Sequence, residues 1–106
     1  MIALQSILVI ISETCRVKIY HITSNSRRAE VVDARSLYIY FGHLNGYSAK
    51  NISEAFVQDE RCIQYHLNRI RKLVTTDKNM RRLYADCSLA VKSFKLRFHI
   101  TNKYHG

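Results

Sequence analysis

The fold of this chain is decided by residues 46–74, which read GYSAKNISEAFVQDERCIQYHLNRIRKLV. Residues 46–56 predict a turn followed by a short helix. After a break of a few residues, 61–74 predict a longer helix, because apolar side chains recur there at helical spacing. Those side chains are Ile63, Leu67, Ile70 and Val74. The sequence therefore predicts two helices joined by a tight connection, which is the pattern of a helix-turn-helix.

The opposite face of the longer helix is polar and cationic. It carries Arg61, Gln64, Tyr65, Asn68 and Lys72. Such a face, opposite an apolar seam, suits the major groove of DNA. The chain as a whole has 17 Lys and Arg against 8 Asp and Glu, a net charge of +9, which indicates a polyanionic partner. Of nucleic acid, an acidic membrane surface and an acidic protein, the helix pattern favours double-stranded DNA.

A chain of 106 residues, 47% of them apolar, is expected to fold as one domain over 1–106. The absence of proline and the presence of only three glycines favour helices. We divide the chain into an N-terminal apolar segment (1–23), a helix-turn-helix domain (24–95) and a frayed basic tail (96–106). A final helix is predicted over 79–95, with the apolar period Met80, Leu83, Tyr84, Cys87, Val91 and Phe94. The predicted fold class is all-α, a bundle of four or five helices.

The residues before the helix pair predict three further segments. Residues 2–15 are apolar and β-branched, and their length favours a buried helix over a strand. Residues 16–22 alternate between apolar and polar side chains, which predicts an extended segment. A polar, basic loop over 23–28 follows, in which Ser26 is the expected N-cap of a helix over 29–45.

Residues 29–45 have the clearest amphipathic pattern in the sequence. The predicted stripe consists of Val31, Ala34, Leu37, Tyr38, Phe41, Leu44 and Asn45. Gly46 is the expected C-cap of this helix, and Ser48 is the expected N-cap of the short helix after it. Asp59 or Glu60 is expected to cap the longer helix.

The cysteines and histidines indicate no cofactor. Cys15, Cys62 and Cys87 are odd in number and far apart in sequence, so no disulfide framework is implied and a reducing compartment is expected. Residues 1–11 are too short to span a bilayer and lack the features of a signal peptide, so we expect a cytosolic protein, nucleoid-associated if the source is bacterial. Cys62 and His66 are too few to hold a metal. No catalytic constellation is present, and we expect no enzyme.

Residues 24–86 resemble, piece by piece and in order, the C-terminal DNA-binding domain of the bacterial replication initiator DnaA. The loop SNSRR (24–28) stands where that family has its Lys- and Arg-rich loop. EVVDARSLYIY (30–40) is similar to the family's E-I-V-x-A-R-x-x-x-x-Y helix, and 46–56 resemble G-x-S-x-x-x-I-G-x-A-F. Residues 63–73 are placed like the family's recognition helix. The resemblance implies a helix-turn-helix fold, Trp-repressor-like, that binds duplex DNA.

The sequence departs from this family directly after Phe56. The family continues with a pattern close to G-G-R-D-H-S/T-T-V, whereas 57–63 read VQDERCI, one residue shorter and without the His and the Thr pair. Those residues read the initiator's DNA box, so the resemblance implies the fold and DNA binding but not that target. The sequence also lacks G-x-x-x-x-G-K-S/T, so it cannot bind and hydrolyse ATP by the initiator's route.

The predicted DNA contacts come from the loop and the helix pair. On the resemblance, Arg27 and Arg28 approach the backbone or the minor groove, whose negative potential suits arginine. Arg61 and Gln64 are the predicted base readers, because Arg pairs with guanine and Gln with adenine in bidentate fashion. The other predicted contacts, to bases one turn on and to phosphates, are Ser48, Lys50, Tyr65, Asn68, Arg69 and Lys72. Arg35 is expected either to bond across to another helix or to touch phosphate.

The competing class is a protein-interaction or structural module, such as a phage component, that kept the fold and lost the DNA contacts. Asp59 and Glu60 favour it, because carboxylates repel phosphates. The expected partners are double-stranded DNA, then replication or transcription proteins, then a second copy of the chain if residues 1–11 are exposed. No membrane partner is expected. A common face for Arg27, Arg28, Arg61, Arg69 and Lys72 would favour DNA.

Overall fold

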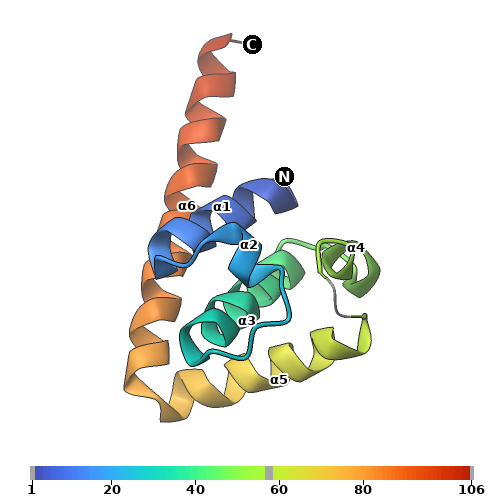
Figure 1. The fold of residues 1–106 in the computed structure, drawn as a ribbon. Helices are drawn as coiled ribbons and strands as arrows, with labels where there is room; N and C mark the ends of the chain where they lie inside the picture. Colours follow the sequence, from blue (N-terminus) through green and yellow to red (C-terminus); the bar gives the residue numbers. More distant parts are fainter. Residues whose placement is uncertain (1, 57–58, 106) are drawn as a thin grey trace.

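The computed structural model describes residues 2–56 and 59–105, and the side chains of 2–56 and 59–97. Within these ranges the chain is all-α, with six helices and no strand, which confirms the predicted fold class (Figure 1). In chain order the helices are α1 (Leu4–Cys15), α2 (Ile19–Ile22), α3 (Ala29–Leu44), α4 (Ala49–Ser53), α5 (Arg61–Thr76) and α6 (Lys78–His105). The expectation of four or five helices is wrong, because the single turn α2 adds a sixth.

Helix α3 lies at the centre of the molecule and contacts each of the other five helices (Figure 1). Residues 35–39 are all buried, so α3 is enclosed on every side rather than along one stripe. The predicted stripe is confirmed for Val31, Ala34, Leu37, Tyr38 and Phe41, which are all buried. It is wrong for Leu44, which is 55% exposed, and burial extends beyond it to Arg35, Ser36 and Ile39. Two of the enclosed residues, Arg35 and Ser36, are polar and are hydrogen-bonded inside the molecule, which makes their burial tolerable.

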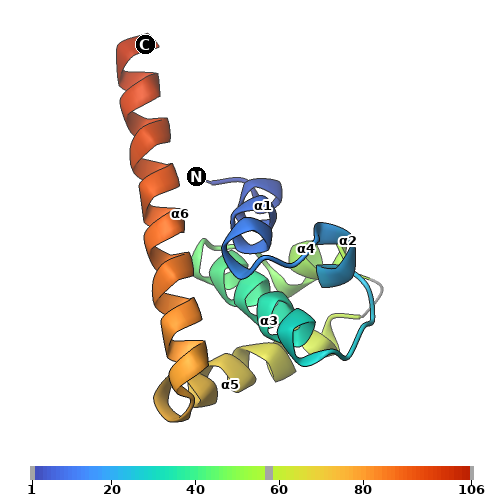
Figure 2. The ribbon, with the colours of Figure 1, turned by 60° about the vertical axis from the view of Figure 1, so that its left-hand side comes forward.

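Helices α1 and α6 pack against each other and against α3. Helix α6 begins next to the end of α5, and its C-terminal part extends beyond the other helices (Figure 2). The predicted frayed tail, 96–106, is wrong as far as residue 105, because no glycine or proline occurs over 79–105 to end the helix. Gly106 lies outside the described residues. Over the described ranges, no helix combines the length and the apolar character that a membrane span needs.

The chain reverses direction directly after α1. Arg16 takes the left-handed conformation there, with a φ of 58°. The helical turn α2 follows, so the predicted extended segment 16–22 is wrong over its second half. The apolar residues Ile19 and Ile22 are three apart, which on a helical turn places both side chains on the side of the core.

The connection between α3 and α4 confirms two predicted caps. Gly46 has a φ of 90°, and the N–H groups of Gly46 and Tyr47 donate to carbonyls of the last turn of α3 at 3.0 and 3.2 Å, as in a Schellman motif. The Ser48 hydroxyl accepts a hydrogen bond from the backbone N–H of Asn51 at 3.1 Å, which caps α4.

The cap predicted for α3 is wrong, whereas the cap predicted for α5, Asp59 or Glu60, is confirmed, because both residues take part in it. Arg28, not Ser26, is the N-cap residue of α3, and α3 begins too far along the chain for the Ser26 hydroxyl to reach its first-turn N–H groups. At the start of α5 the N-cap residue is Glu60, whose side chain makes no capping bond. The carboxylate of Asp59 instead accepts the backbone N–H of Arg61 at 2.9 Å.

We predict that Ser48→Ala lowers the free energy of unfolding by about 1 kcal/mol, because the Asn51 N–H loses its acceptor. Ser53→Ala is the matched control, since the Ser53 hydroxyl only donates to the Lys50 carbonyl within α4. Urea denaturation followed by circular dichroism measures both variants. Equal losses from the two substitutions would contradict the capping role.

Candidate nucleic-acid interface

Helix α5 has the two faces that the sequence predicts. Ile63, Leu67 and Ile70 are buried, and Val74 packs half-buried against the same core. The outward face exposes Gln64, Tyr65, Asn68 and Lys72. Helix α4 packs beside α5 and α3, and its Ile52 is fully buried. The α4–α5 pair is therefore anchored by apolar side chains, and the polar face of α5 is free to meet a partner.

Two adjoining hollows run along this face. The larger, about 930 Å³, lies between the 23–28 loop and the first half of α5, and it is lined by Arg27, Arg61 and Tyr65 among others. The smaller, about 430 Å³, continues along α5. Its lining residues are Tyr65, Asn68, Arg69, Lys72 and Leu73. Because Tyr65 and Arg69 line both, the hollows form one surface, which we term the basic groove.

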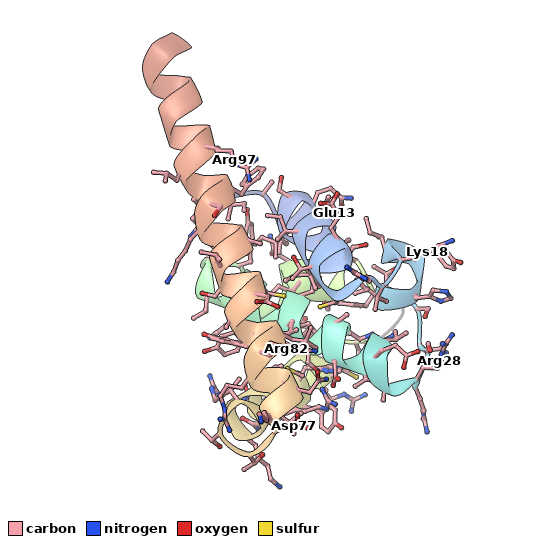
Figure 3. The ribbon with its side chains drawn as sticks, turned by 90° about the vertical axis from the view of Figure 1, so that its left-hand side faces the viewer. Glu13, Lys18, Arg28, Asp77, Arg82 and Arg97 are labelled. Carbon is pink, nitrogen blue, oxygen red and sulfur yellow. The ribbon has the colours of Figure 1, made fainter. Side chains whose placement is uncertain are left out.

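The basic groove brings together six of the ten predicted contact residues. These are Arg27, Arg61, Tyr65, Asn68, Arg69 and Lys72. Gln64 is exposed on α5 outside the lining of either hollow, and Ser48 and Lys50 are exposed at the start of α4. Arg28 lies next to the start of α3, on the side of the molecule away from α6 (Figure 3). Four of the five cations named for a common face thus line one groove, and Arg28 does not.

Three of the six predicted cations are paired with carboxylates. Arg28 pairs with Glu30 at 2.7 Å, and Arg61 with Asp59 at 3.0 Å. Both pairs are exposed, and exposed pairs contribute little stability, so a stronger acceptor can displace the carboxylate. The third pair joins Arg69 to Asp33 at 2.7 Å and is largely shielded from solvent. Within the described part of the chain, the remaining cations form no ion pair: Arg27, Lys50 and Lys72.

Arg35 fastens the loop that forms one wall of the basic groove. Its guanidinium donates to the carbonyls of Ile22, Ser26 and His21 at 2.7, 2.9 and 3.2 Å, and the residue is only 2% exposed. Burial lowers the pKa of Arg35 from its ordinary value. Of the two roles expected for Arg35, the structure shows the bond across to another helix, since His21 and Ile22 belong to α2, together with a bond to the loop at Ser26. The guanidinium thereby positions Arg27, one residue after Ser26.

Arg69 also has an internal role that the sequence did not indicate. Its guanidinium donates to Asp33 at 2.7 Å and to the Ser36 hydroxyl at 3.1 Å, which ties α5 to α3. Ser36 in turn bonds Nδ1 of His66 at 2.7 Å, and both residues are buried. The only sequence signal for this network was the position of His66, three residues after Ile63 and four before Ile70, on the apolar seam of α5.

The buried imidazole of His66 is held in its neutral form. Burial, together with the positive charges of Arg35 and Arg69, lowers its pKa to about 4. Because Arg69 donates to the Ser36 oxygen, the Ser36 hydroxyl is free to donate to His66, so we assign Nδ1 as the acceptor and the ring proton to Nε2. Protonation of His66 would remove that acceptor and add a third charge to the network.

The sequence offered one pair of metal-binding candidates, Cys62 and His66, and both line the larger hollow. Among the described residues, no group of three or more His, Cys, Asp or Glu could hold a metal. All three cysteines are free thiols.

No family model and no curated protein matches this chain. The resemblance to the initiator's DNA-binding domain therefore stays a prediction. What can be argued about function rests on the basic groove and on the residues that support it.

Proposed function

We propose that this protein is a double-stranded-DNA-binding module. In this proposal α4 and α5 act as a helix-turn-helix, α5 enters the major groove, and the 23–28 loop meets the neighbouring backbone or minor groove. The observation that carries the proposal is the basic groove itself. It places the unpaired cations Arg27 and Lys72 on one surface with the exposed Tyr65 and Asn68 between them. Cations that contact phosphates beside polar groups that contact bases are what sequence-specific binding requires.

The individual roles follow from what each side chain is free to do. Lys72 and Arg27 have no carboxylate partner among the described side chains, and they supply phosphate contacts, with Lys50 adding one from the start of α4. Arg61 reads a base after leaving its exposed pair with Asp59, and Gln64 reads a second one from the adjoining turn. Arg69 is not among the proposed contacts, because Asp33 and Ser36 occupy its guanidinium. Its part is to hold α5 in position.

The biological role that fits such a module is regulation of transcription or replication. The resemblance to the C-terminal domain of the bacterial initiator DnaA supports this assignment. The recognition segment differs from that family after Phe56 and the sequence has no ATP-binding pattern, so the proposal does not extend to initiation itself.

A protein-interaction module is the second candidate, and one observation favours it. Asp59 and Glu30 stand beside the predicted contact residues and neutralise Arg61 and Arg28. A surface of mixed charge is better matched to another protein than to a uniform polyanion. The two candidates predict different results when the Asp59 carboxylate is removed. DNA binding should tighten if the groove binds DNA, and it should not tighten specifically if the groove binds a protein.

The roles of Lys72 and Arg61 are separated by alanine substitution. We predict that Lys72→Ala weakens binding to all duplexes by about threefold to tenfold and reduces the salt slope by about 1, because a phosphate contact carries no sequence information. Arg61→Ala should cost about 1–3 kcal/mol on the preferred sequence and much less on others. Fluorescence anisotropy with a panel of duplexes measures both, and Arg82→Ala on α6 is the control. Uniform losses from both Lys72→Ala and Arg61→Ala would contradict base reading by Arg61.

We predict that Asp59→Asn tightens DNA binding by about threefold to tenfold at low salt. The change removes a carboxylate near the phosphates and frees Arg61, while the amide oxygen still accepts the Arg61 backbone N–H. Asp86→Asn, on α6 and outside the basic groove, makes the same change in net charge and is the matched control. An equal gain from both variants would mean that net charge alone, and not the groove, governs affinity.

A further inference from the structure

Two cysteines that are far apart in sequence meet between α1 and α6. Cys15 is the last residue of α1, and Cys87 lies within α6. Their Sγ atoms are 3.9 Å apart, close enough for the two thiols to share a hydrogen bond. The sequence implied no disulfide pairing because the cysteines are 72 residues apart, and only the packing of α1 against α6 brings them together.

The two sulfur atoms differ in exposure and in acidity. Cys87 is fully buried, whereas Cys15 is half-buried. The shared hydrogen bond lowers the pKa of Cys15, whereas that hydrogen bond and burial raise the pKa of Cys87. The thiolate is the reactive form of cysteine, so Cys15 is both the more accessible and the more nucleophilic of the pair.

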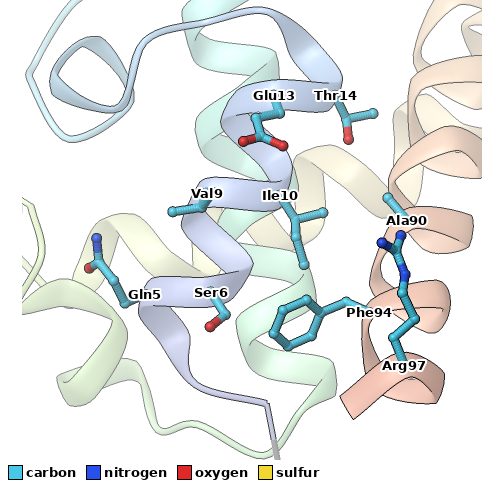
Figure 4. A pocket seen from close by; sticks show the side chains of 9 residues that line it. All are labelled: Gln5, Ser6, Val9, Ile10, Glu13, Thr14, Ala90, Phe94 and Arg97. Carbon is cyan, nitrogen blue, oxygen red and sulfur yellow. The ribbon is translucent and has the colours of Figure 1, made fainter. Parts of the chain in front are cut away.

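A hollow of about 560 Å³ lies beside this pair, between α1 and α6 (Figure 4). Its lining includes Thr14, which precedes Cys15, and Ala90, which lies about one helical turn after Cys87. The side chains of Ile10 and Phe94 also face the hollow from the two helices (Figure 4). The hollow therefore borders the turns of α1 and α6 that carry the two cysteines, although neither cysteine lines it.

We propose that Cys15 and Cys87 are a modification site that forms an intramolecular disulfide by exchange with a low-molecular-weight disulfide such as oxidised glutathione. The Cys15 thiolate attacks one sulfur of the small disulfide and displaces the other as a thiolate, which leaves a mixed disulfide on Cys15. The Cys87 thiol then loses its proton and attacks Sγ of Cys15, which releases the second small thiol. The two protein thiols are oxidised, and one small disulfide is reduced to two thiols.

The bond would tie α1 to α6 and close a long loop, which stabilises a small domain chiefly by restricting its unfolded state. The sulfur atoms need only close the gap between them, because the two helices are already packed together. The pair does not line the basic groove, so the inference is independent of the proposed function. DNA binding should be the same in the oxidised and the reduced protein.

The test is incubation of the full chain with oxidised or reduced glutathione at mildly alkaline pH, followed by intact-mass measurement and peptide mapping. We expect the mass to fall by two hydrogen atoms, a Cys15–Cys87 cross-linked peptide, and a melting temperature higher by about 10 °C. Cys62→Ser, the matched control, should behave like the parent chain, and Cys15→Ser should lose the shift. A stable glutathione adduct without loss of hydrogen, disulfide-linked dimers, or unchanged mass would overturn the proposal. Because mass and mapping are read on the parent chain, a variant that fails to fold leaves the test intact.

Discussion

Replacement of Arg35 by methionine is expected to lower the free energy of unfolding by about 3 kcal/mol. Methionine is apolar and of similar length, so the change removes the desolvation cost of the guanidinium. It also removes the donors to the Ile22 and Ser26 carbonyls, for which the described residues offer no other donor. The buried Ile22 carbonyl left unpaired costs about 1–3 kcal/mol, the half-buried Ser26 carbonyl adds a smaller cost, and the sum outweighs the gain.

Two variants sharpen this prediction. Arg35→Lys keeps the positive charge but replaces a planar fork by a single point donor, so it should recover only part of the stability. Arg82→Met on α6 is the control for loss of an exposed arginine, and it should change stability little. Denaturant unfolding measures the three variants. A neutral or stabilised Arg35→Met protein would show that the guanidinium does not hold the loop.

The second large effect is loss of stability in acid through His66. The pKa of His66 is about 4 in the folded protein and 6.5 when unperturbed, so the unfolded state takes up a proton first. The stabilisation from keeping this ring neutral is complete above pH 6.5 and is lost as the pH falls from 6.5 towards 4. The shift corresponds to a loss of about 3 kcal/mol over that range.

His66→Asn separates this effect from the carboxylates that titrate at similar pH. The asparagine oxygen can accept the Ser36 hydroxyl as Nδ1 does, but it does not titrate. From pH 7 to pH 4 the parent chain should lose about 3 kcal/mol of unfolding free energy relative to His66→Asn. His43→Asn, an exposed position on α3, is the control and should keep the parent pH dependence. A constant difference between parent and His66→Asn would contradict the neutral, buried ring.

The elements that the sequence predicts correctly depend on local signals. The apolar spacing of Ile63, Leu67 and Ile70 marks the buried face of α5, and the structure confirms it. Gly46 and Ser48 end one helix and begin the next through bonds to residues only a few positions away. Such signals act within one or two turns, so the sequence contains all that is needed to read them.

The errors arise where tertiary contacts decide. Helix α3 is enclosed on every side because five helices surround it, and no periodicity within 29–45 shows how many neighbours a helix will have. The alternation in 16–22 fits a strand and one helical turn equally well, and the reversal at Arg16 selects the turn. The last helix was predicted to end at 95 and to be followed by a basic tail, but α6 continues to His105.

The candidate site was predicted only in part for a related reason. The exposed residues of α5 follow from its periodicity, whereas the partners of its cations do not. Arg69 pairs with Asp33, 36 residues away in the sequence, and His66 bonds to Ser36, 30 residues away. The sequence could not decide between the two roles of Arg35, because it does not show the hydrogen-bond partners of the guanidinium. Charge counts show that a surface is basic, but only the fold shows which cations are already neutralised.

DNA binding by the basic groove is tested most directly by titrating the parent chain against a random duplex and an initiator-box duplex at 50 and 200 mM salt, with fluorescence anisotropy as the readout. Three unpaired cations at or beside the groove, Arg27, Lys50 and Lys72, predict a salt slope of at least about −2.7 and therefore about a 40-fold loss of affinity between the two salt concentrations. A preference for the box would mean that the altered recognition segment still reads it. Absence of binding to either duplex at low salt would contradict the account and favour a protein partner.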